Sequence, residues 1–182
     1  EAHIFHLGSL LNDDFSPEVV EFLSGKGLVS IDVQDYLREV RGEEVHAISW
    51  KDKEKILRHT DMLKLNEYEM KVITDSDNPR TVAEKLNTMG VREVIITLGS
   101  YGAIIFADRK FYEIPAYKPH EIVDATGCGD TFSTGYLYCR TQGMGYEDSG
   151  KFAAAMCTLK LEHSGPFDRS IEDIEKVIAS NK

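Results

Sequence analysis

The segment from Asp124 to Phe132 reads Asp-Ala-Thr-Gly-Cys-Gly-Asp-Thr-Phe and sets two glycines between two carboxylates. Gly127, Cys128 and Gly129 stand where a helix is expected to begin, so several backbone N–H groups are left bare and point one way. Such a concavity, backed by the positive end of the helix dipole, attracts anions and phosphate above all. The segment therefore predicts an anion site made by the amides of these three residues.

Asp130 lies in the first turn of the same expected helix. A carboxylate beside a phosphate site repels the ligand, so its presence needs a chemical reason. A general base is one such reason, because it takes the proton from a hydroxyl group that attacks the bound phosphoryl group. The alternative is a glycine-rich helix entry in which Asp130 only favours the helix dipole. These residues alone leave both interpretations open.

Asn66-Glu67-Tyr68-Glu69 directly follows an apolar run. Asn66 at the N-cap and Glu69 at N3 resemble a capping box, which is the simplest interpretation. The same spacing places an amide and a carboxylate on one helix face at the carboxyl edge of a sheet, where ligands of α/β folds collect. Glu69 could then hold a hydrated Mg²⁺, and Asn66 a phosphate or its water.

Ile96-Thr97-Leu98-Gly99-Ser100-Tyr101-Gly102 reads as a strand that ends in a glycine-bounded turn. Gly99 and Gly102 would let the backbone approach a flat ligand such as a purine, although a plain β-turn also explains the spacing. Two common phosphate-binding patterns fail. The run 145–151 has Walker A spacing but is followed by Phe152 rather than Ser or Thr, and we interpret it as a helix–helix turn. Gly127-Cys128-Gly129 lacks the closing glycine of a dinucleotide fingerprint.

Strands and helices alternate around these motifs. A helix begins after Ser16 with an expected buried stripe of Val19, Val20, Phe22 and Leu23. A less regular charged stretch runs to Glu44, followed by a short element at Val45–Ser49 and an exposed helix at Lys51–His59. The other expected strands are Ala2–Leu7, Leu28–Ile31, Met62–Leu65, Val94–Leu98, Ala103–Ala107 and Phe111–Ile114. Further helices are expected to begin at Asn66, at Asn78-Pro79 and at Gly127; another contains residues 152–159, and the last covers Ser170–Ile178. This order predicts a three-layer α/β/α sandwich with a mostly parallel sheet, in one domain over residues 1–182.

Composition narrows the possible functions. The 182 residues carry 31 Asp and Glu against 21 Lys and Arg, a net charge of −10 that disfavours nucleic acid as a partner. No apolar run approaches the ~18 residues that a membrane span requires. The 3 cysteines form no CxxC pair and favour a reduced, cytoplasmic setting. Cys128, in the glycine turn, could be a partly exposed thiol that the amides activate.

The three motifs occur in one order, and in this order the sequence resembles the ribokinase-like (PfkB) carbohydrate kinases. Asn66-x-x-Glu69, Thr97-Leu98-Gly99-x-x-Gly102 and the segment Asp124–Phe132 carry the resemblance; the last is similar to the family signature Asp-Thr-x-Gly-Ala-Gly-Asp. The resemblance implies ATP-dependent phosphorylation of a hydroxymethyl group on a sugar or related small molecule. It assigns Asp130 as the base, the 127–129 amides as the anion hole, Asn66 and Glu69 as the Mg²⁺–phosphate motif, and Thr97, Gly99, Ser100 and Gly102 to the nucleotide region.

The resemblance also implies a monovalent-cation site, for K⁺ in some members, at the positions of Asp124 and Thr126. Cys128 replaces the usual alanine, which leaves the backbone amide in place. Ser164-Gly165-Pro166 departs from the usual Gly-Ala ending near the nucleotide and cation loops.

The chain begins at Glu1 and enters a strand almost at once, so we expect it to be the C-terminal portion of a longer kinase. The first strands, a β lid and most sugar contacts of the family would lie upstream. We expect this portion to be inactive alone and to self-associate through the uncovered sheet edge. Two alternatives stay open: a nucleoside or vitamin-precursor kinase of the same fold, and a non-catalytic nucleotide-binding regulatory module.

Overall fold

Six strands form the main sheet, in the order β1-β2-β5-β6-β7-β8. The junctions of β1 with β2, of β2 with β5 and of β5 with β6 are all parallel. Their bounds are β1 Ile4–Leu7, β2 Leu28–Asp32, β5 Met62–Asn66, β6 Glu93–Thr97, β7 Ala103–Ala107 and β8 Lys110–Ile114. The computed structural model describes residues 2–8, 11–41 and 44–181. The expected strands are confirmed to within one or two residues.

The chain divides into two compact units. Unit 1 comprises Glu1–Thr97 and Ile104–Phe111, and unit 2 comprises Leu98–Ala103 and Tyr112–Lys182. In unit 1 the central strands β5 and β6 have successive buried residues on both faces, from Leu63 to Leu65 and from Val94 to Ile96. Burial on both faces is typical of parallel strands that helices cover, and it explains their nearly continuous apolar runs.

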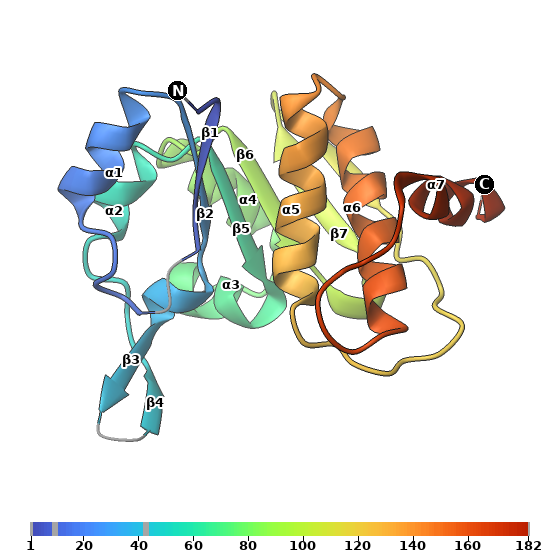
Figure 1. Cartoon of the computed structure of the whole chain (residues 1–182). Helices are drawn as coiled ribbons and strands as arrows, with labels where there is room; N and C mark the ends of the chain where they lie inside the picture. Colours follow the sequence, from blue (N-terminus) through green and yellow to red (C-terminus); the bar gives the residue numbers. More distant parts are fainter. Residues whose placement is uncertain (1, 9–10, 42–43, 182) are drawn as a thin grey trace. The chain divides into compact units, whose positions relative to one another are not determined.

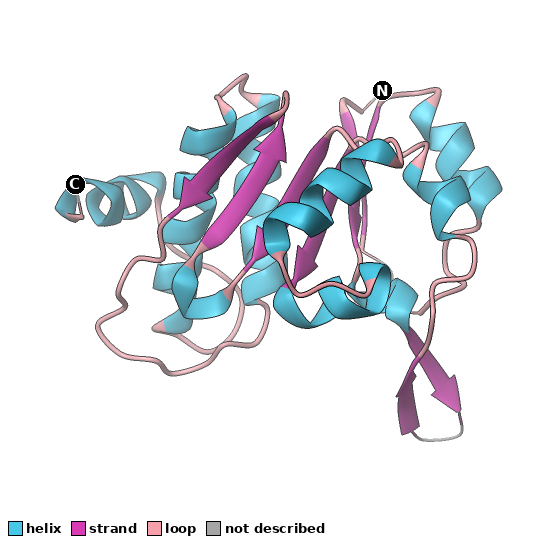
Figure 2. Cartoon of the chain, turned by 180° about the vertical axis from the view of Figure 1, so that it is seen from behind, coloured by secondary structure: helices cyan, strands magenta, loops and turns pink. Residues whose placement is uncertain are grey.

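The described residues of unit 1 form four α-helices: α1 (Pro17–Ser24), α2 (Lys53–Leu57), α3 (Glu67–Thr74) and α4 (Pro79–Thr88). Helix α1 packs against β2 and α2, while α3 and α4 pack against β5, β6 and each other (Figure 1, Figure 2). The expected stripe of α1 was wrong in part, because Val20 is buried while Val19 and Phe22 are 42% and 65% exposed. At 100° per residue, Val19 and Phe22 share a face that is turned away from the Val20 side.

The stretch between β2 and β5 is more regular than its charged sequence indicates. After a short 3₁₀ turn, η1 (Gln34–Leu37), β3 (Arg38–Arg41) and β4 (Glu44–Ala47) pair antiparallel as a hairpin that projects from unit 1 (Figure 1). The exposed helix expected at Lys51–His59 is shortened to α2, and its Ile56 and Leu57 are buried. The residues of β3, Arg-Glu-Val-Arg, are mostly charged, so the sequence carries no clear alternating apolar pattern for this strand.

Unit 2 contains the 3₁₀ turn η2 (Gly99–Tyr101), the end of β8 and the helices α5 (Cys128–Thr141), α6 (Tyr146–Leu161) and α7 (Ile171–Ser180). Helix α5 lies along α6, and α7 packs against α6 near the C-terminus (Figure 1). Gly135 allows the close approach of α5 and α6, because a Cβ there would lie 3.1 Å from the Ala153 Cα. The Walker A-like run is not a turn: Gly145 is the N-cap and 146–151 form the first turns of α6.

Among the described residues, no helix has both the length and the apolar character needed to cross a membrane.

Candidate active site

The glycine segment forms the N-terminus of α5, as expected. Gly127 is the N-cap, with φ 77° in the left-handed region that glycine adopts without strain. The helix starts with the Thr131 N–H donating to the Gly127 carbonyl at 2.9 Å. The Cys128 N–H is already bonded to the Ala125 carbonyl at 3.2 Å, so it contributes less to an anion site than the sequence indicates. The amides of positions 129 and 130 make no hydrogen bond within the described part of the chain.

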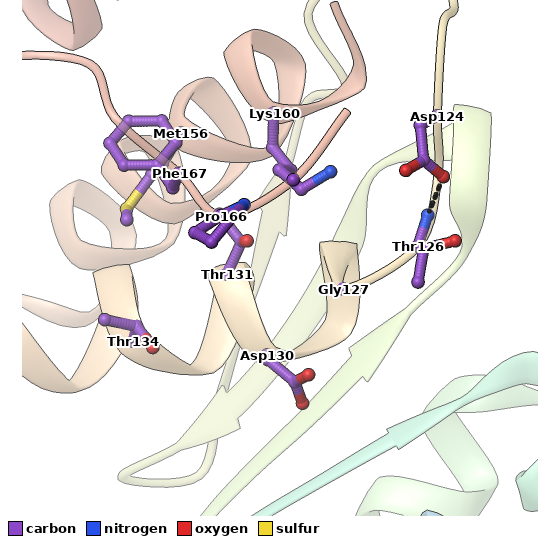
Figure 3. A pocket seen from close by; sticks show the side chains of 11 residues that line it. Asp124, Thr126, Gly127, Asp130, Thr131, Thr134, Met156, Lys160, Pro166 and Phe167 are labelled. Atoms are coloured by element: carbon purple, nitrogen blue, oxygen red, sulfur yellow. Dashed lines mark hydrogen bonds between the residues drawn. The ribbon is translucent and has the colours of Figure 1, made fainter. Parts of the chain in front are cut away.

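A pocket of about 490 Å³ lies at this helix end, within unit 2 (Figure 3). It brings together four residues that the sequence analysis selected: Asp124, Thr126, Gly127 and Asp130. The Asp130 side chain is exposed and extends from the first turn of α5. The remaining lining residues are Thr131, Thr134, Met156, Lys160, Gly165, Pro166 and Phe167.

Asp124 is held in place by the loop around it. Its Oδ1 accepts a hydrogen bond from the Thr126 N–H at 2.9 Å, and its Oδ2 accepts one from the Ser164 hydroxyl at 3.2 Å. The hydrogen bonds from Thr126 are the main cause of a lowered pKa for the Asp124 carboxyl group, with smaller contributions from Ser164 and Lys160. The carboxylate is therefore ionised at neutral pH and joins the loops on either side of the pocket.

Lys160 is a lining residue that sequence reasoning missed. It lies in the last turn of α6 and is buried, and a Cβ on Gly127 would stand 4.0 Å from its Cε. Its Nζ donates to the His163 carbonyl at 3.2 Å. A signal was present, since Met156 and Lys160 are four residues apart and share a face of α6, where a charged residue breaks an apolar pattern.

Cys128 is not an activated thiol. Burial raises the pKa of the Cys128 thiol, and the Asp124 charge adds to that effect, while the Lys160 charge acts in the opposite direction. The expectation of an amide-activated cysteine was therefore wrong, because partial burial outweighs the nearby positive charge. The Cys128 carbonyl accepts a hydrogen bond from the Cys157 thiol at 3.2 Å, so the residue has a structural contact to α6.

Asn66 and Glu69 lie in unit 1, at the end of β5 and in the first turn of α3. They form the capping box that the spacing predicts, with both reciprocal hydrogen bonds present. The sheet register pairs Asn66 with Thr97, so both stand at the carboxyl ends of adjacent parallel strands. Glu69 is buried, and Thr97 is half-buried with its hydroxyl 3.5 Å from the Leu65 carbonyl.

The turn after β6 belongs to unit 2 and contains Gly99, Ser100 and Gly102. The Leu98 N–H donates to the Gly102 carbonyl at 2.8 Å and closes the turn. Gly102 has φ 89°, and a Cβ there would stand 2.0 Å from the Ile114 carbonyl oxygen. Gly99 also has a positive φ, of 55°, but nothing lies within 4 Å of a Cβ there, so Gly99 and the exposed Ser100 leave the outer side of the turn open.

Residues 38–173 match the family described as pfkB family carbohydrate kinase. The chain belongs to the PfkB family. This match covers the glycine segment, the capping box and the turn after β6, the three motifs on which the resemblance was based.

Two curated relatives from archaea show how far the PfkB similarity extends. An uncharacterized sugar kinase of Archaeoglobus fulgidus is 35% identical over 125 residues, which cover 66% of this chain and 49% of that protein. A nucleoside kinase of Methanocaldococcus jannaschii is 27% identical over 169 residues, which cover 90% of this chain and 52% of that protein. The chain thus spans about half the length of these relatives.

Solved structures confirm the PfkB fold. Two structures of pyrophosphate-dependent kinases match with TM-scores of 0.86 and 0.85 at 28% identity. One is a myo-inositol-1 kinase converted into a myo-inositol-3 kinase by mutation, and the other is complexed with a pyrophosphate analog and myo-inositol. The matches cover 100% and 97% of this chain and 64% and 63% of those chains. The Arabidopsis thaliana ribokinase complexed with ribose and ATP matches with a TM-score of 0.74 at 23% identity, over 89% of this chain and 51% of that chain. The three-layer α/β sandwich expected from the sequence is confirmed.

Proposed function

We propose that this chain is the nucleotide-binding and catalytic portion of an ATP-dependent kinase that phosphorylates a hydroxyl group of a sugar or sugar-like small molecule. The observation that carries the proposal is the position of Asp130. Its exposed carboxylate lies in the first turn of α5, beside the unbonded amides of 129 and 130, in one pocket with Gly127. A base next to an anion site is what phosphoryl transfer to a hydroxyl group requires.

In the proposed reaction, Asp130 accepts the proton of the acceptor hydroxyl as its oxygen attacks the terminal phosphorus of the donor. The bond from this phosphorus to the bridging oxygen breaks, and ADP leaves with that electron pair. The amides at the start of α5 donate hydrogen bonds to the phosphoryl oxygens, whose charge the helix dipole also stabilises. The products are the phosphorylated acceptor, ADP and one proton, which Asp130 later releases to solvent.

Mg²⁺ is the proposed cofactor, and Glu69 and Asn66 are the proposed motif for it. Among the described residues, no three acidic, His or Cys side chains form a metal-binding group. A hydrated Mg²⁺ bound largely by phosphate oxygens fits one carboxylate such as Glu69 better than a full protein cage does. When bound, Mg²⁺ would neutralise charge on the donor phosphates. We also propose Asp124 and Thr126 as the site of a monovalent cation such as K⁺.

Pyrophosphate is a second candidate for the phosphoryl donor. It is favoured by the two matches with pyrophosphate-dependent kinases, which cover nearly all of this chain. Both donors end in a phosphoanhydride, so the roles of Asp130 and the α5 amides are the same for either. A direct comparison of turnover with ATP and with pyrophosphate decides between them.

The acceptor is proposed as a sugar, with a nucleoside as the alternative, because one relative is described as a sugar kinase and another as a nucleoside kinase. We propose that residues outside this chain supply most acceptor contacts, and that the reaction takes place in the cytoplasm, where the three free thiols would stay reduced. The isolated chain would then be inactive and would self-associate through the edge strand β1. Analytical ultracentrifugation at tens of micromolar tests the association, and a purely monomeric species would contradict it.

The test of the proposed function is Asp130→Asn in the full-length protein. Loss of a general base should lower turnover by about 10²- to 10⁴-fold while ATP binding is retained. Asp148→Asn is the matched control, because Asp148 is also an exposed carboxylate in the first turn of a helix, α6. Unchanged turnover in Asp130→Asn would refute the assignment of the base. A full-length protein that binds ATP but phosphorylates no sugar or nucleoside would instead favour a regulatory module.

A further inference from the structure

Lys160 is a buried cation whose charge is not paired within the described residues. The residue is 5% exposed, and its ammonium group makes one hydrogen bond, to the His163 carbonyl at 3.2 Å. An ammonium group has three N–H donors, so two remain. No carboxylate oxygen of the described residues lies within 4.0 Å of the Lys160 Nζ, the distance limit for an ion pair. Burying a charge in this way is costly unless an opposite charge compensates it.

The position of Lys160 indicates where the opposite charge would come from. The side chain lines the pocket at the N-terminus of α5, and its Cε lies next to Gly127. In Figure 3 its Nζ is directed toward the side of the pocket on which Asp124 lies. Its charge contributes to lowering the pKa of the Asp124 carboxyl group and opposes the rise in the pKa of the Cys128 thiol. The ammonium group therefore lies near the residues that lead into α5, whose first turn contains the unbonded amides.

A lysine charge at this position offsets negative charge in the pocket. Asp124 and Asp130 both line it, and two carboxylates repel a phosphate. Lys160 is the one basic side chain among the described residues that line the pocket. The amides of 129 and 130 supply dipoles but no full charge, so the pocket becomes favourable for a phosphate through Lys160.

We propose that Lys160 binds the terminal phosphate of the phosphoryl donor, as a fixed positive charge opposite the amides of α5. This inference rests on the proposed function and adds a residue that recognises the phosphates of the donor and not its base. Lys160 would bind ATP and pyrophosphate through the phosphoanhydride end that they share. It would contribute nothing to the binding of an uncharged nucleoside.

The experiment measures binding without turnover, by calorimetry on the full-length protein, with ATP, pyrophosphate and adenosine as separate probes. Lys160→Met removes the charge and keeps most of the length of the side chain. Lys160→Arg keeps the charge. Lys151→Met is the matched control, because Lys151 lies on the same helix and pairs with Glu147 at 2.6 Å outside the pocket.

We expect Lys160→Met to weaken ATP and pyrophosphate binding by about 10- to 100-fold, the range of a charge-assisted hydrogen bond, with adenosine binding unchanged. Lys160→Arg should restore most of the affinity, and Lys151→Met should have no effect. Equal losses for ATP and adenosine would show that Lys160 only supports the end of α6, and would overturn the proposal. Unchanged binding of ATP and pyrophosphate to Lys160→Met would also overturn the proposal. In that case the proposed function would still stand if Asp130→Asn had lost turnover.

Discussion

Asn66 and Glu69 bind each other through three hydrogen bonds at the start of α3. The Asn66 N–H and side-chain amide donate to the two Glu69 carboxylate oxygens at 2.7 and 2.8 Å, and the Asn66 carbonyl oxygen accepts from the Glu69 N–H at 3.1 Å. The Glu69 carboxylate is thus oriented before any ligand arrives. A residue that is both a helix cap and a proposed metal ligand links stability to activity, and the two effects can be separated.

Glu69→Gln should weaken both the cap and the response to Mg²⁺. A Gln side chain offers one acceptor oxygen in place of two, so the free energy of unfolding should fall by about 1 kcal/mol. Urea unfolding measures this change. The Mg²⁺ concentration for half-maximal turnover of the full-length protein should rise severalfold, because a neutral amide binds the hydrated ion less strongly.

Asn78→Ala is the matched control for this prediction. Asn78 is also an Asn N-cap in unit 1, and its side chain accepts from the amides of Arg80 and Thr81. Its loss should cost a similar amount of stability without changing the Mg²⁺ requirement. An equal change in Mg²⁺ requirement for both variants would mean that Glu69 acts through helix stability alone.

Gly102→Ala should destabilise the protein strongly. A Cβ at this position would stand 2.0 Å from the Ile114 carbonyl oxygen and 2.8 Å from the Ala116 nitrogen, and the backbone φ of 89° is itself unfavourable. Clash and strain together should cost about 3 kcal/mol. Gly143→Ala is the control, since its φ is 75° with nothing within 4 Å, and it should cost about 1 kcal/mol. Equal decreases in the free energy of unfolding of Gly102→Ala and Gly143→Ala, measured by chemical denaturation, would contradict the predicted clash.

Asp32 and Lys64 form a buried ion pair at 2.5 Å, on adjacent positions of β2 and β5. Lys64→Met should cost about 3–5 kcal/mol, because it leaves the Asp32 carboxylate buried without its partner. The double variant Asp32→Leu with Lys64→Met should recover most of this loss. Urea unfolding of the two single variants and the double variant measures the coupling, and additive losses would show that the pair does not interact.

Asp173 should contribute to the acid sensitivity of the fold. Hydrogen bonds from Ser170, and then from Lys176, hold the pKa of the Asp173 carboxyl group below its usual value. Because the folded pKa is depressed, the contribution is present above the unfolded pKa of about 3.9 and is lost as the pH falls through the folded pKa. The Tm difference between the parent and Asp173→Asn should therefore be largest at neutral pH and should decrease as the pH is lowered toward 3.

Glu175→Gln is the control for Asp173, because it removes a charge from the same helix without touching the capping box. The Tm of Glu175→Gln should differ little from that of the parent at every pH between 6 and 3. A Tm difference for Asp173→Asn that stays constant between pH 6 and pH 3 would show that the capping box contributes no acid-sensitive stability.

Local features of the fold could be predicted from the sequence because their signals lie within a few residues. Asn66 and Glu69 are three positions apart, and the structure contains the capping box that this spacing predicts. The glycines at 127 and 129 likewise mark the start of α5. The hairpin of β3 and β4 had no such signal, because the mostly charged residues of β3 carry no clear apolar alternation.

By itself, the sequence determined the α/β order of elements, the helix that begins at Gly127 and the carboxylate of Asp130 in its first turn. Only the tertiary structure placed Lys160 beside Gly127 and Gly102 against Ile114. The physical reason is the distance along the chain. Caps and glycine turns are set by neighbouring residues, whereas a buried charge or a backbone contact is set by whichever distant segment packs against it.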